Sequence, residues 1–246
     1  MQSNVPSHAQ EQNTRPLSAA IFLYEGMPAI EAVAPYEALS LVPNVVVKTV
    51  AETAGPKRCD SGMMTIVADY ALDEVHHPDI FVIPGGNIQG LIHNDHVLSW
   101  IRTAHETSLY SAAMCVGSLL LGAAGLLQGV HVATLQGIEL PSFGEIRVPG
   151  SIVADGKIVT GTNAAVGLDL GIYLAVKIAG DQIARAVQIG LEYDLDNWKP
   201  PYAPRLVEDV KPEEFQTFME IMRVNPRMAA LQAIDDTTQA IVSAEK

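Results

Sequence analysis

Cys115 is the residue of this chain that is best placed for chemistry. It stands between a short apolar run, Ser108–Met114, and a segment rich in leucine and small residues, Ser118–Leu127. The first pattern predicts a buried strand and the second a helix, so the cysteine falls at a strand-to-helix turn. N–H groups and the dipole at the helix start favour a thiolate there. The pattern indicates a nucleophile elbow with cysteine in place of serine, the alternative being a small cysteine that only packs.

A glycine pair supplies a second candidate feature. Gly85 and Gly86 follow a predicted buried strand, Asp79–Ile83. Glycines there expose backbone N–H groups without obstruction by side chains. Together with the N–H of Val116, they would hold a developing negative charge, as an oxyanion hole does. The alternative interpretation is a simple tight turn.

These groups need a sheet to bring them together, and the chain alternates strand and helix patterns. The expected strands are Ser18–Tyr24, Asn44–Ala51, Thr65–Val67, Asp79–Ile83, the run before Cys115, Val130–Leu135 and a hairpin over Ser151–Thr160. The expected helices are Ala29–Leu41, one that contains Trp100 and Ile101, Ala165–Ile178 and Asp181–Leu191. Such alternation predicts an α/β fold with a mostly parallel sheet and helices on both faces. Ligands bind such sheets beyond the carboxyl ends of the strands.

One domain with two appendages accounts for the rest of the chain. Residues 1–17 are polar and predict a flexible amino-terminal tail rather than a signal peptide. Residues 18–193 carry the α/β pattern. Residues 194–246 predict a proline-containing loop and two helices, Lys211–Arg223 and Pro226–Val242, which are too short for a core of their own and so are expected to pack on the same domain.

The charge of the chain limits the expected partners, and its cysteine content indicates the expected compartment. Fifteen basic and 28 acidic residues give a net charge of −13, which argues against nucleic acid and anionic membranes as partners. No apolar stretch is long enough to span a bilayer. Two cysteines suggest no disulfide framework, and a reactive thiol suits a reducing compartment, so a cytoplasmic location is expected.

Three motifs, Ile83–Gly86, Ala113–Gly117 and Ile30–Pro35, together resemble the ThiJ/PfpI superfamily, and the resemblance runs from about residue 19 to about residue 193. It implies a flavodoxin-like three-layer sandwich, a homodimer and a nucleophilic cysteine. Further segments are most similar to the isonitrile hydratase branch of that superfamily: Asp60–Gly62, Leu121–Leu127, Gly167–Asp169 and Leu191–Asp194.

The resemblance also assigns a role to Glu31. In the superfamily, an acidic residue of the first loop approaches the cysteine sulfur in its protonated form, and Glu31 stands at that position. Burial beside a thiolate would raise its pKa, so that it would hydrogen-bond to the sulfur of Cys115 and act as a general acid. Taken without Cys115, Glu31 would be interpreted as a solvated helix residue.

The chain departs from the superfamily pattern at two positions. Many members place a histidine after the strand that follows the cysteine helix, where this chain has Leu135. His131 lies four residues earlier and is expected to point elsewhere, which argues against a Cys–His dyad. The isonitrile hydratase branch typically has threonine after the cysteine, where this chain has Val116. That change removes a hydroxyl from the expected site.

No cofactor and no metal site are expected. His93 and His96 flank an acidic residue, but no third ligand follows at zinc spacing. Cys59 stands between Arg58 and Asp60 and is expected to be an ordinary surface cysteine.

The leading hypothesis is a cysteine-dependent enzyme of the isonitrile hydratase type, acting on a small molecule. Cys115 would attack an isocyanide, Glu31 would supply a proton, and water would hydrolyse the thioimidate to an N-formamide. A first alternative keeps the cysteine but takes 2-oxoaldehydes or glycated adducts, as glyoxalases and deglycases do. A second alternative is a redox sensor in which Cys115 is oxidised.

Overall fold

The computed structural model of the chain describes residues 15–133 and 142–193, together with residues 213, 216, 217 and 220. Nearly all of the predicted tail and of the 194–246 extension therefore lies outside the described residues. Seven strands form one sheet in the order β10-β11-β7-β6-β1-β2-β5. All neighbouring strands in it are parallel except β10 and β11. The predicted α/β class with a mostly parallel sheet is confirmed.

The strands of this sheet are β1 (Leu17–Phe22), β2 (Val45–Ala51), β5 (Tyr70–Ala71), β6 (Ile80–Ile83), β7 (Tyr110–Met114), β10 (Ile152–Asp155) and β11 (Ile158–Gly161). Two smaller pairs are β3 (Gly55–Arg58) with β4 (Thr65–Ala68), and β8 (His131–Ala133) with β9 (Ile146–Val148). The helices are α1 (Ala29–Ser40), α2 (Asp95–Thr107), α3 (Ser118–Ala123) and α4 (Gly167–Gly190), with 3₁₀ turns η1 (Leu72–Glu74), η2 (Cys115–Gly117) and η3 (Ala164–Val166).

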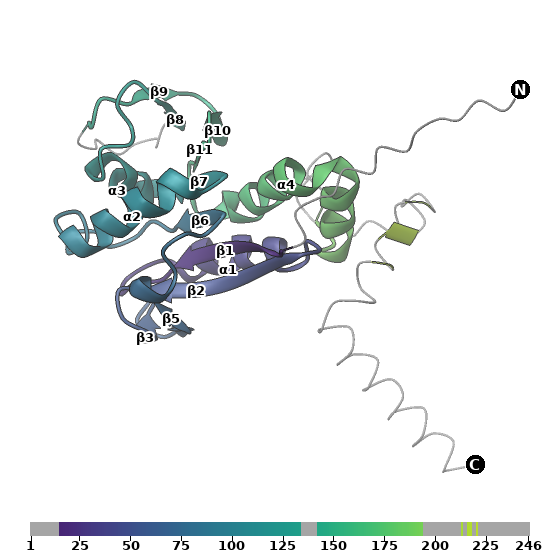
Figure 1. The fold of residues 1–246 in the computed structure, drawn as a ribbon, viewed down its shortest axis with the longest axis horizontal. Coiled ribbons are helices and arrows are strands. Elements are labelled where there is room, and N and C mark those ends of the chain that lie inside the picture. The colour runs from purple at the N-terminus through teal and green to yellow at the C-terminus, as the bar shows by residue number, and fades with distance from the viewer. Residues whose placement is uncertain (1–14, 134–141, 194–212, 214–215, 218–219, 221–246) are drawn as a thin grey trace, which may run out of the picture.

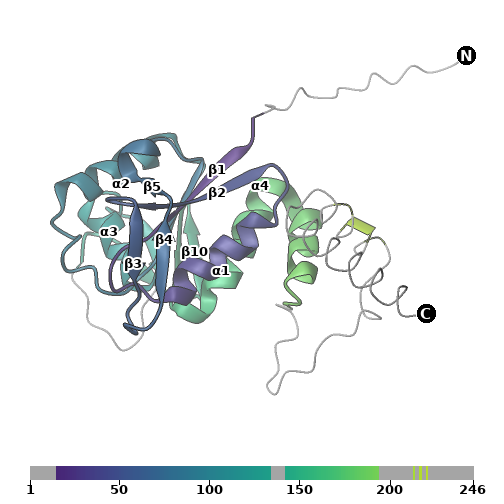
Figure 2. The same cartoon turned by 90° about the horizontal axis from the view of Figure 1, so that it is seen from below.

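The helices cover both faces of the sheet. Figures 1 and 2 show α1 and α4 together on one side and α2 and α3 on the other. The chain runs from β1 outward to β2 in one direction and from β6 outward to β7 in the other, so the strand order reverses between β1 and β6. The crevice beyond the carboxyl ends of these two strands is where open α/β sheets bind ligands.

Burial on both faces explains the continuous apolar strands. Every residue of β6 is buried, as is every residue of β1 from Ala19 onward. A strand covered by helices on each side has no solvent-facing positions, so the alternating pattern of an exposed sheet is absent. On the α1 side, Gly171 of α4 lets the two helices approach, since an added Cβ would lie 2.5 Å from the Cβ of Ala38.

Most predicted elements are present, with three differences. The predicted strand Thr65–Val67 is β4, which pairs with β3 outside the main sheet. The predicted helix after Cys115 ends at Ala123 instead of Leu127. The extended segment predicted to reach Leu135 is described only as far as Ala133. As predicted, α4 consists of two helical segments, which meet at Gly180 with a φ of 83°.

Within residues 15–133 and 142–193, no helix combines the length and the apolar character that a membrane span requires.

Asp79 fastens the start of β1 to the start of β6. Its carboxylate accepts hydrogen bonds from both terminal nitrogens of Arg15 at 2.6 and 2.7 Å and from the backbone N–H of Ser18 at 2.8 Å. The Arg15 guanidinium, helped by the Ser18 N–H, holds the pKa of Asp79 below its usual range despite the opposing effect of burial. The carboxylate is therefore an anchor for the central strands.

Replacing Asp79 by asparagine should lower the free energy of unfolding at pH 7 by about 1.5–3 kcal/mol, the usual range for hydrogen bonds to charged groups. A carboxyl group with a depressed folded-state pKa stabilises the protein above its unfolded pKa of about 4, and this contribution is lost as the pH falls through the folded value. The difference between wild type and Asp79→Asn should therefore shrink under acidic conditions. Urea titrations across pH 7 to 2 measure it, with Asp69→Asn at an exposed site as the control; a gap that stays constant to pH 2 would contradict the assignment.

Candidate active site

The cysteine lies at the turn that the sequence predicts, between β7 and α3. Cys115 has a φ of 50°, a left-handed conformation that residues other than glycine seldom adopt. Such backbone strain concentrates at functional sites, and a sharp strand-to-helix turn of this kind exposes a nucleophile. Gly117 closes the turn against the end of β6, because an added Cβ would overlap the carbonyl oxygens of Ile83 and Pro84.

Glu31 comes to the same place from the first turn of α1. Its side chain is buried, and its Oε2 accepts a hydrogen bond of 2.6 Å from the backbone N–H of Gly85. A Cβ added to Gly85 would lie 2.8 Å from the Cβ of Cys115 and 3.0 Å from Oε2 of Glu31. The missing side chain of Gly85 therefore leaves open the space beside which both Cys115 and Glu31 lie. Three parts of the sequence meet here, as expected for the switch point of the sheet.

The predicted hydrogen bond between Glu31 and the Cys115 sulfur is absent among the described residues. The carboxyl group is bonded to the N–H of Gly85 instead. The two groups still interact electrostatically, because a charged Glu31 raises the pKa of Cys115. The expectation of a direct hydrogen bond needs correction: the two groups lie near each other, but the carboxyl oxygen is bonded to the backbone of Gly85.

Burial sets the protonation of Glu31. Loss of hydration raises its pKa, the Gly85 N–H lowers it, and the carboxylate of Asp60 on the β3–β4 hairpin raises it again. The net direction is upward, as predicted from the expected burial. Because Oε2 accepts from Gly85, the acid proton is left to Oε1. Glu31 is thus equipped to act as a proton donor.

The thiol of Cys115 differs from the prediction of a depressed pKa. Burial raises its pKa, a charged Glu31 raises it further, and the N–H of Val116 lowers it. The difference arises because burial and the neighbouring Glu31 outweigh the stabilisation of the thiolate by the Val116 N–H at the turn. Protonation of Glu31 removes one of the two causes that raise the pKa of Cys115.

The three predicted oxyanion donors have different environments. The N–H of Gly85 is donated to Glu31, so this donor is already engaged. The N–H of Val116 faces the sulfur of Cys115. Gly86, with a φ of 114°, packs against the backbone of Gly26, and no acceptor for its N–H is found in the described part of the chain. Gly85 could act as the predicted oxyanion donor only by releasing Glu31, whereas Gly86 and Val116 stay candidate donors without that requirement.

Sequence reasoning did not single out Tyr24, which follows β1. Its hydroxyl lies 2.6 Å from the carbonyl oxygen of Gly85 and 2.8 Å from that of Pro84. Burial, with smaller contributions from Glu31 and Cys115, raises its pKa far above the usual value, so it remains a donor at all ordinary pH values. A tyrosine at the carboxyl end of a central buried strand was the available signal.

His131 lies away from the cysteine, as predicted. Its ring Nδ1 is 2.8 Å from Oδ2 of Asp155, which also accepts from the His131 backbone N–H. Asp155 pairs with Ile158, and Ile158 is level with Ser111 on β7. Ser111 precedes Cys115 by four residues, or about 13 Å along a strand. The geometry gives no dyad between Cys115 and His131.

Cys59 is buried rather than on the surface, so that prediction is wrong. It lies in the β3–β4 turn, where burial and the carboxylates of Asp60 and Glu25 raise its pKa against a smaller opposing effect of Arg58. The hairpin turn packs on the loop before α1, where the N–H of Asp60 donates to Met27. Among the residues that the structure describes, no cluster of three His, Cys, Asp or Glu side chains suited to a metal ion is found.

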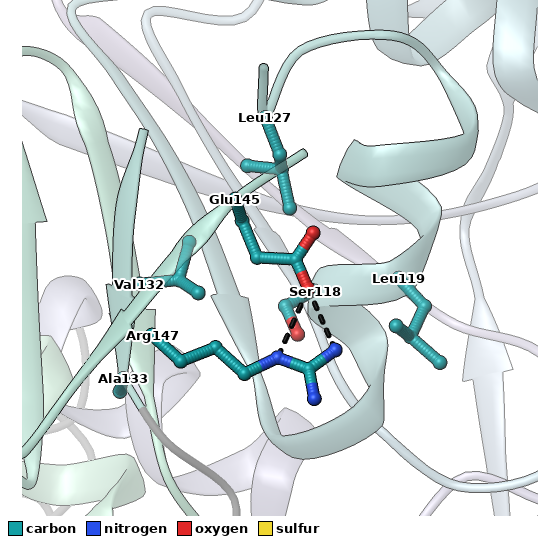
Figure 3. Close-up of a pocket in the computed structure, with 7 residues that line it drawn as sticks. All are labelled: Ser118, Leu119, Leu127, Val132, Ala133, Glu145 and Arg147. Atoms are coloured by element: carbon teal, nitrogen blue, oxygen red, sulfur yellow. Dashed lines mark hydrogen bonds and ion pairs between the residues drawn. The ribbon is translucent and has the colours of Figure 1, made fainter. Parts of the chain in front are cut away.

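Two cavities border the site without containing Cys115. A small one, of about 10 Å³, lies behind the turn beside Ser118, where Arg147 pairs with Glu145 at 2.6 Å (Figure 3). Its volume suits about one water molecule. A larger one, of about 290 Å³, lies on the carboxyl side of β1 and is lined in part by Tyr24 and Asn87. Neither of these two cavities is lined by Cys115 itself.

Comparison with known proteins identifies one family in both sequence and structure. A model of the DJ-1/PfpI family matches residues 17–175. An isonitrile hydratase of Pseudomonas putida is 30% identical over 200 residues, covering 78% of this chain and 87% of that protein. A ThiJ/PfpI family protein from Pseudomonas syringae has a similar structure, with a TM-score of 0.68, 22% identity, and coverage of 93% of this chain and 97% of that one. Drosophila melanogaster DJ-1beta follows, with a TM-score of 0.65, 20% identity, and coverage of 73% and 99%.

Placing a methyl group on Gly85 should block the site. Because the new Cβ would press on Cys115 and on Glu31, Gly85→Ala should slow alkylation of Cys115 by iodoacetamide by about tenfold or more, a change of roughly 1.4 kcal/mol in the barrier. Peptide mapping of the labelled protein follows Cys115 and the buried Cys59 separately.

The matched control is Gly90→Ala, whose added Cβ meets no atom within 4 Å. It should react at the wild-type rate. Equal rates for Gly85→Ala and Gly90→Ala would show that Gly85 does not shape access to the sulfur.

Proposed function

This chain belongs to the DJ-1/PfpI family, and we propose that it is a cysteine-dependent enzyme that hydrates a small isocyanide to an N-formamide. The observation that carries the proposal is the placement of Glu31, a buried carboxyl group with a raised pKa, beside Cys115 at the space that Gly85 leaves open. A nucleophile and an acid that face the same space suit an addition that needs both. The isonitrile hydratase of Pseudomonas putida supports the choice of substrate class.

In the first step, the thiolate of Cys115 attacks the terminal carbon of the isocyanide, forming a C–S bond. Glu31 delivers its proton to the same carbon, which gives a thioimidate, S–CH=N–R, and leaves Glu31 as a carboxylate. Burial keeps Glu31 protonated to a higher pH than an exposed glutamate, so the acid is available where the thiolate begins to form.

In the second step, water adds to the thioimidate carbon, and the Glu31 carboxylate accepts one of its protons. The other water proton moves to the nitrogen as the carbonyl group forms, and the C–S bond breaks. The products are R–NH–CHO, the thiolate of Cys115 and protonated Glu31, which is the starting state of the site. Negative charge that develops on oxygen would be met by the N–H groups of Gly86 and Val116. No cofactor takes part, and water is the only co-reactant.

The partial burial of Cys115 favours this proposal over a redox sensor. Cysteines that sense oxidants are exposed thiolates of low pKa, whereas Cys115 is only partly exposed and burial raises its pKa. In the proposed reaction Glu31 is protonated when the thiolate forms, so its charge does not oppose thiolate formation. The proposal requires reduced Cys115, which a reducing compartment such as the cytoplasm maintains.

The side chain of Val116 should make hydration slow. It packs on the core beside the cysteine and offers no hydroxyl to the reacting carbon. Val116→Thr keeps the branched shape, so we expect faster formation of N-formamide from cyclohexyl isocyanide, by on the order of tenfold to a hundredfold if the hydroxyl stabilises the transition state. Proton NMR of the formyl group measures both rates.

Two variants serve as controls for the chemistry. Cys115→Ser should abolish turnover, and Glu31→Gln should reduce it by roughly 10²-fold or more, since a general acid contributes that much. Turnover of methylglyoxal without any formamide would replace the proposed substrate class with 2-oxoaldehydes. Protein that turns over neither compound, with Cys115 reduced, would refute the enzymatic proposal.

We also propose a homodimer. Apolar side chains are exposed near the site on two elements: Ile30 and Val33 on α1 are 54% and 38% exposed, and Met63 and Met64 at the β3–β4 turn are 87% and 51% exposed. Exposed apolar patches of this kind mark protein interfaces.

Replacing Ile30 and Met63 together by lysine should shift the protein toward monomer, because two charges would have to be buried in the contact. Light scattering after size exclusion measures the mass. The control is Leu109→Lys, which adds a charge at an apolar side chain that is 48% exposed and lies outside the patch, directly before β7. An unchanged dimer in the double lysine variant would place the interface elsewhere.

A further inference from the structure

Tyr24 connects the end of β1 to the Pro84–Gly85 turn, which borders both Cys115 and Glu31. The hydroxyl has one proton, and two carbonyl oxygens lie within its reach, Gly85 O at 2.6 Å and Pro84 O at 2.8 Å. Short distances and burial make this a well-formed contact, since the side chain is only 5% exposed. The ring packs on Phe22, with centroids 5.5 Å apart, so the hydroxyl is held in position.

The peptide groups that Tyr24 binds also contact Glu31 and the cysteine turn. The N–H of Gly85 donates to Glu31, and its carbonyl accepts from Tyr24. The carbonyl of Pro84 also lies against Gly117, at the end of the cysteine turn. Any rotation of the 84–85 backbone would therefore move the donor of Glu31 and disturb the contact with the cysteine turn together.

We infer that Tyr24 is a positioning residue, which fixes the Pro84–Gly85 backbone so that Gly85 holds the Glu31 carboxyl group beside Cys115. The role rests on the proposed function for its catalytic consequence, but its effect on Glu31 does not depend on any substrate. Tyr24 touches no reacting atom and acts through the turn alone.

The surroundings of Glu31 define what would change without the hydroxyl. The charged or titratable groups that act on Glu31 or share its site are Asp60 from the β3–β4 turn, Cys115 from the end of β7 and Tyr24 itself. The one favourable contact for the Glu31 carboxylate among the described residues is the Gly85 N–H, which lowers its pKa. Loosening this donor disfavours the carboxylate, so the pKa of Glu31 should rise.

The test is Tyr24→Phe, which removes one oxygen and keeps the ring. In protein labelled with ¹³C at the glutamate carboxyl carbon, the titration of Glu31, assigned with Glu31→Gln, should move to higher pH by about half a unit or more, as expected when a backbone donor to a carboxylate is lost. Turnover of isocyanide, where present, should fall about tenfold in kcat with little change in KM, since the donor and acid act in the transition state.

Tyr110→Phe makes the same chemical change at the other end of β7, roughly 16 Å from Cys115 by strand rise, and should leave the Glu31 titration unchanged. Incorporation of 3-fluorotyrosine at position 24 keeps the donor and should retain the wild-type titration within a few tenths of a unit. A thermal melt of each protein reports folding, and the fluorinated protein keeps the comparison available if Tyr24→Phe does not fold.

A double-mutant cycle separates positioning from a direct effect on sulfur. Tyr24→Phe should shift the pH midpoint of Cys115 alkylation when Glu31 is present and much less in the Glu31→Gln background. An unshifted Glu31 titration in Tyr24→Phe overturns the inference, as does an equal alkylation shift in both backgrounds. Failure of wild type to turn over isocyanide refutes the proposed function alone, because the Glu31 titration is read without substrate.

Discussion

The site depends on backbone segments that approach one another more closely than side chains would permit. The turn after β6 lies against the site at Gly85, where an added Cβ would crowd both Cys115 and Glu31, and the start of α3 rests on the same turn through Gly117. Glycine at 85 and 117 is therefore a packing requirement, because a Cβ at either position would overlap its neighbours. The close approach of nucleophile and acid depends on the space that Gly85 leaves open.

Burial keeps both reactive groups protonated. Removing a carboxyl group from water keeps its proton, and removing a thiol from water does the same, so both Glu31 and Cys115 have raised pKa values. A site with both groups neutral has no like-charge repulsion. The thiolate forms at the smallest cost while Glu31 keeps its proton, which couples attack by sulfur to the availability of the acid.

Membership of the DJ-1/PfpI family is compatible with more than one chemistry, so residues around the nucleophile carry the distinction. His131 is bonded to Asp155 at the edge of the sheet, so it forms no Cys–His pair with Cys115. Val116 differs from the residue of sites that have a hydroxyl directly after the cysteine. The substrate class proposed here therefore rests on Cys115, Glu31 and the N–H donors near them.

The sequence by itself determined the alternation of strands and helices, the turn at Cys115 and the family. These are local properties: apolar runs, glycines and prolines act over a few residues, and a motif such as Pro84–Gly86 is recognisable without knowing its neighbours. The ends of short elements are less well determined by local pattern. The helix after Cys115 is accordingly shorter than its apolar pattern predicts.

Tertiary structure alone decided which groups meet and how they titrate. The use of the Gly85 N–H by Glu31, the hydroxyl of Tyr24 on the same turn, the burial of Cys59 and the raised pKa of Cys115 each involve residues far apart in the chain. Hydrogen bonds form or fail over fractions of an ångström, and desolvation depends on every atom that covers a group. Neither quantity is encoded in the spacing of residue types, so the sequence could name the reactive residues but could not fix their protonation or their partners.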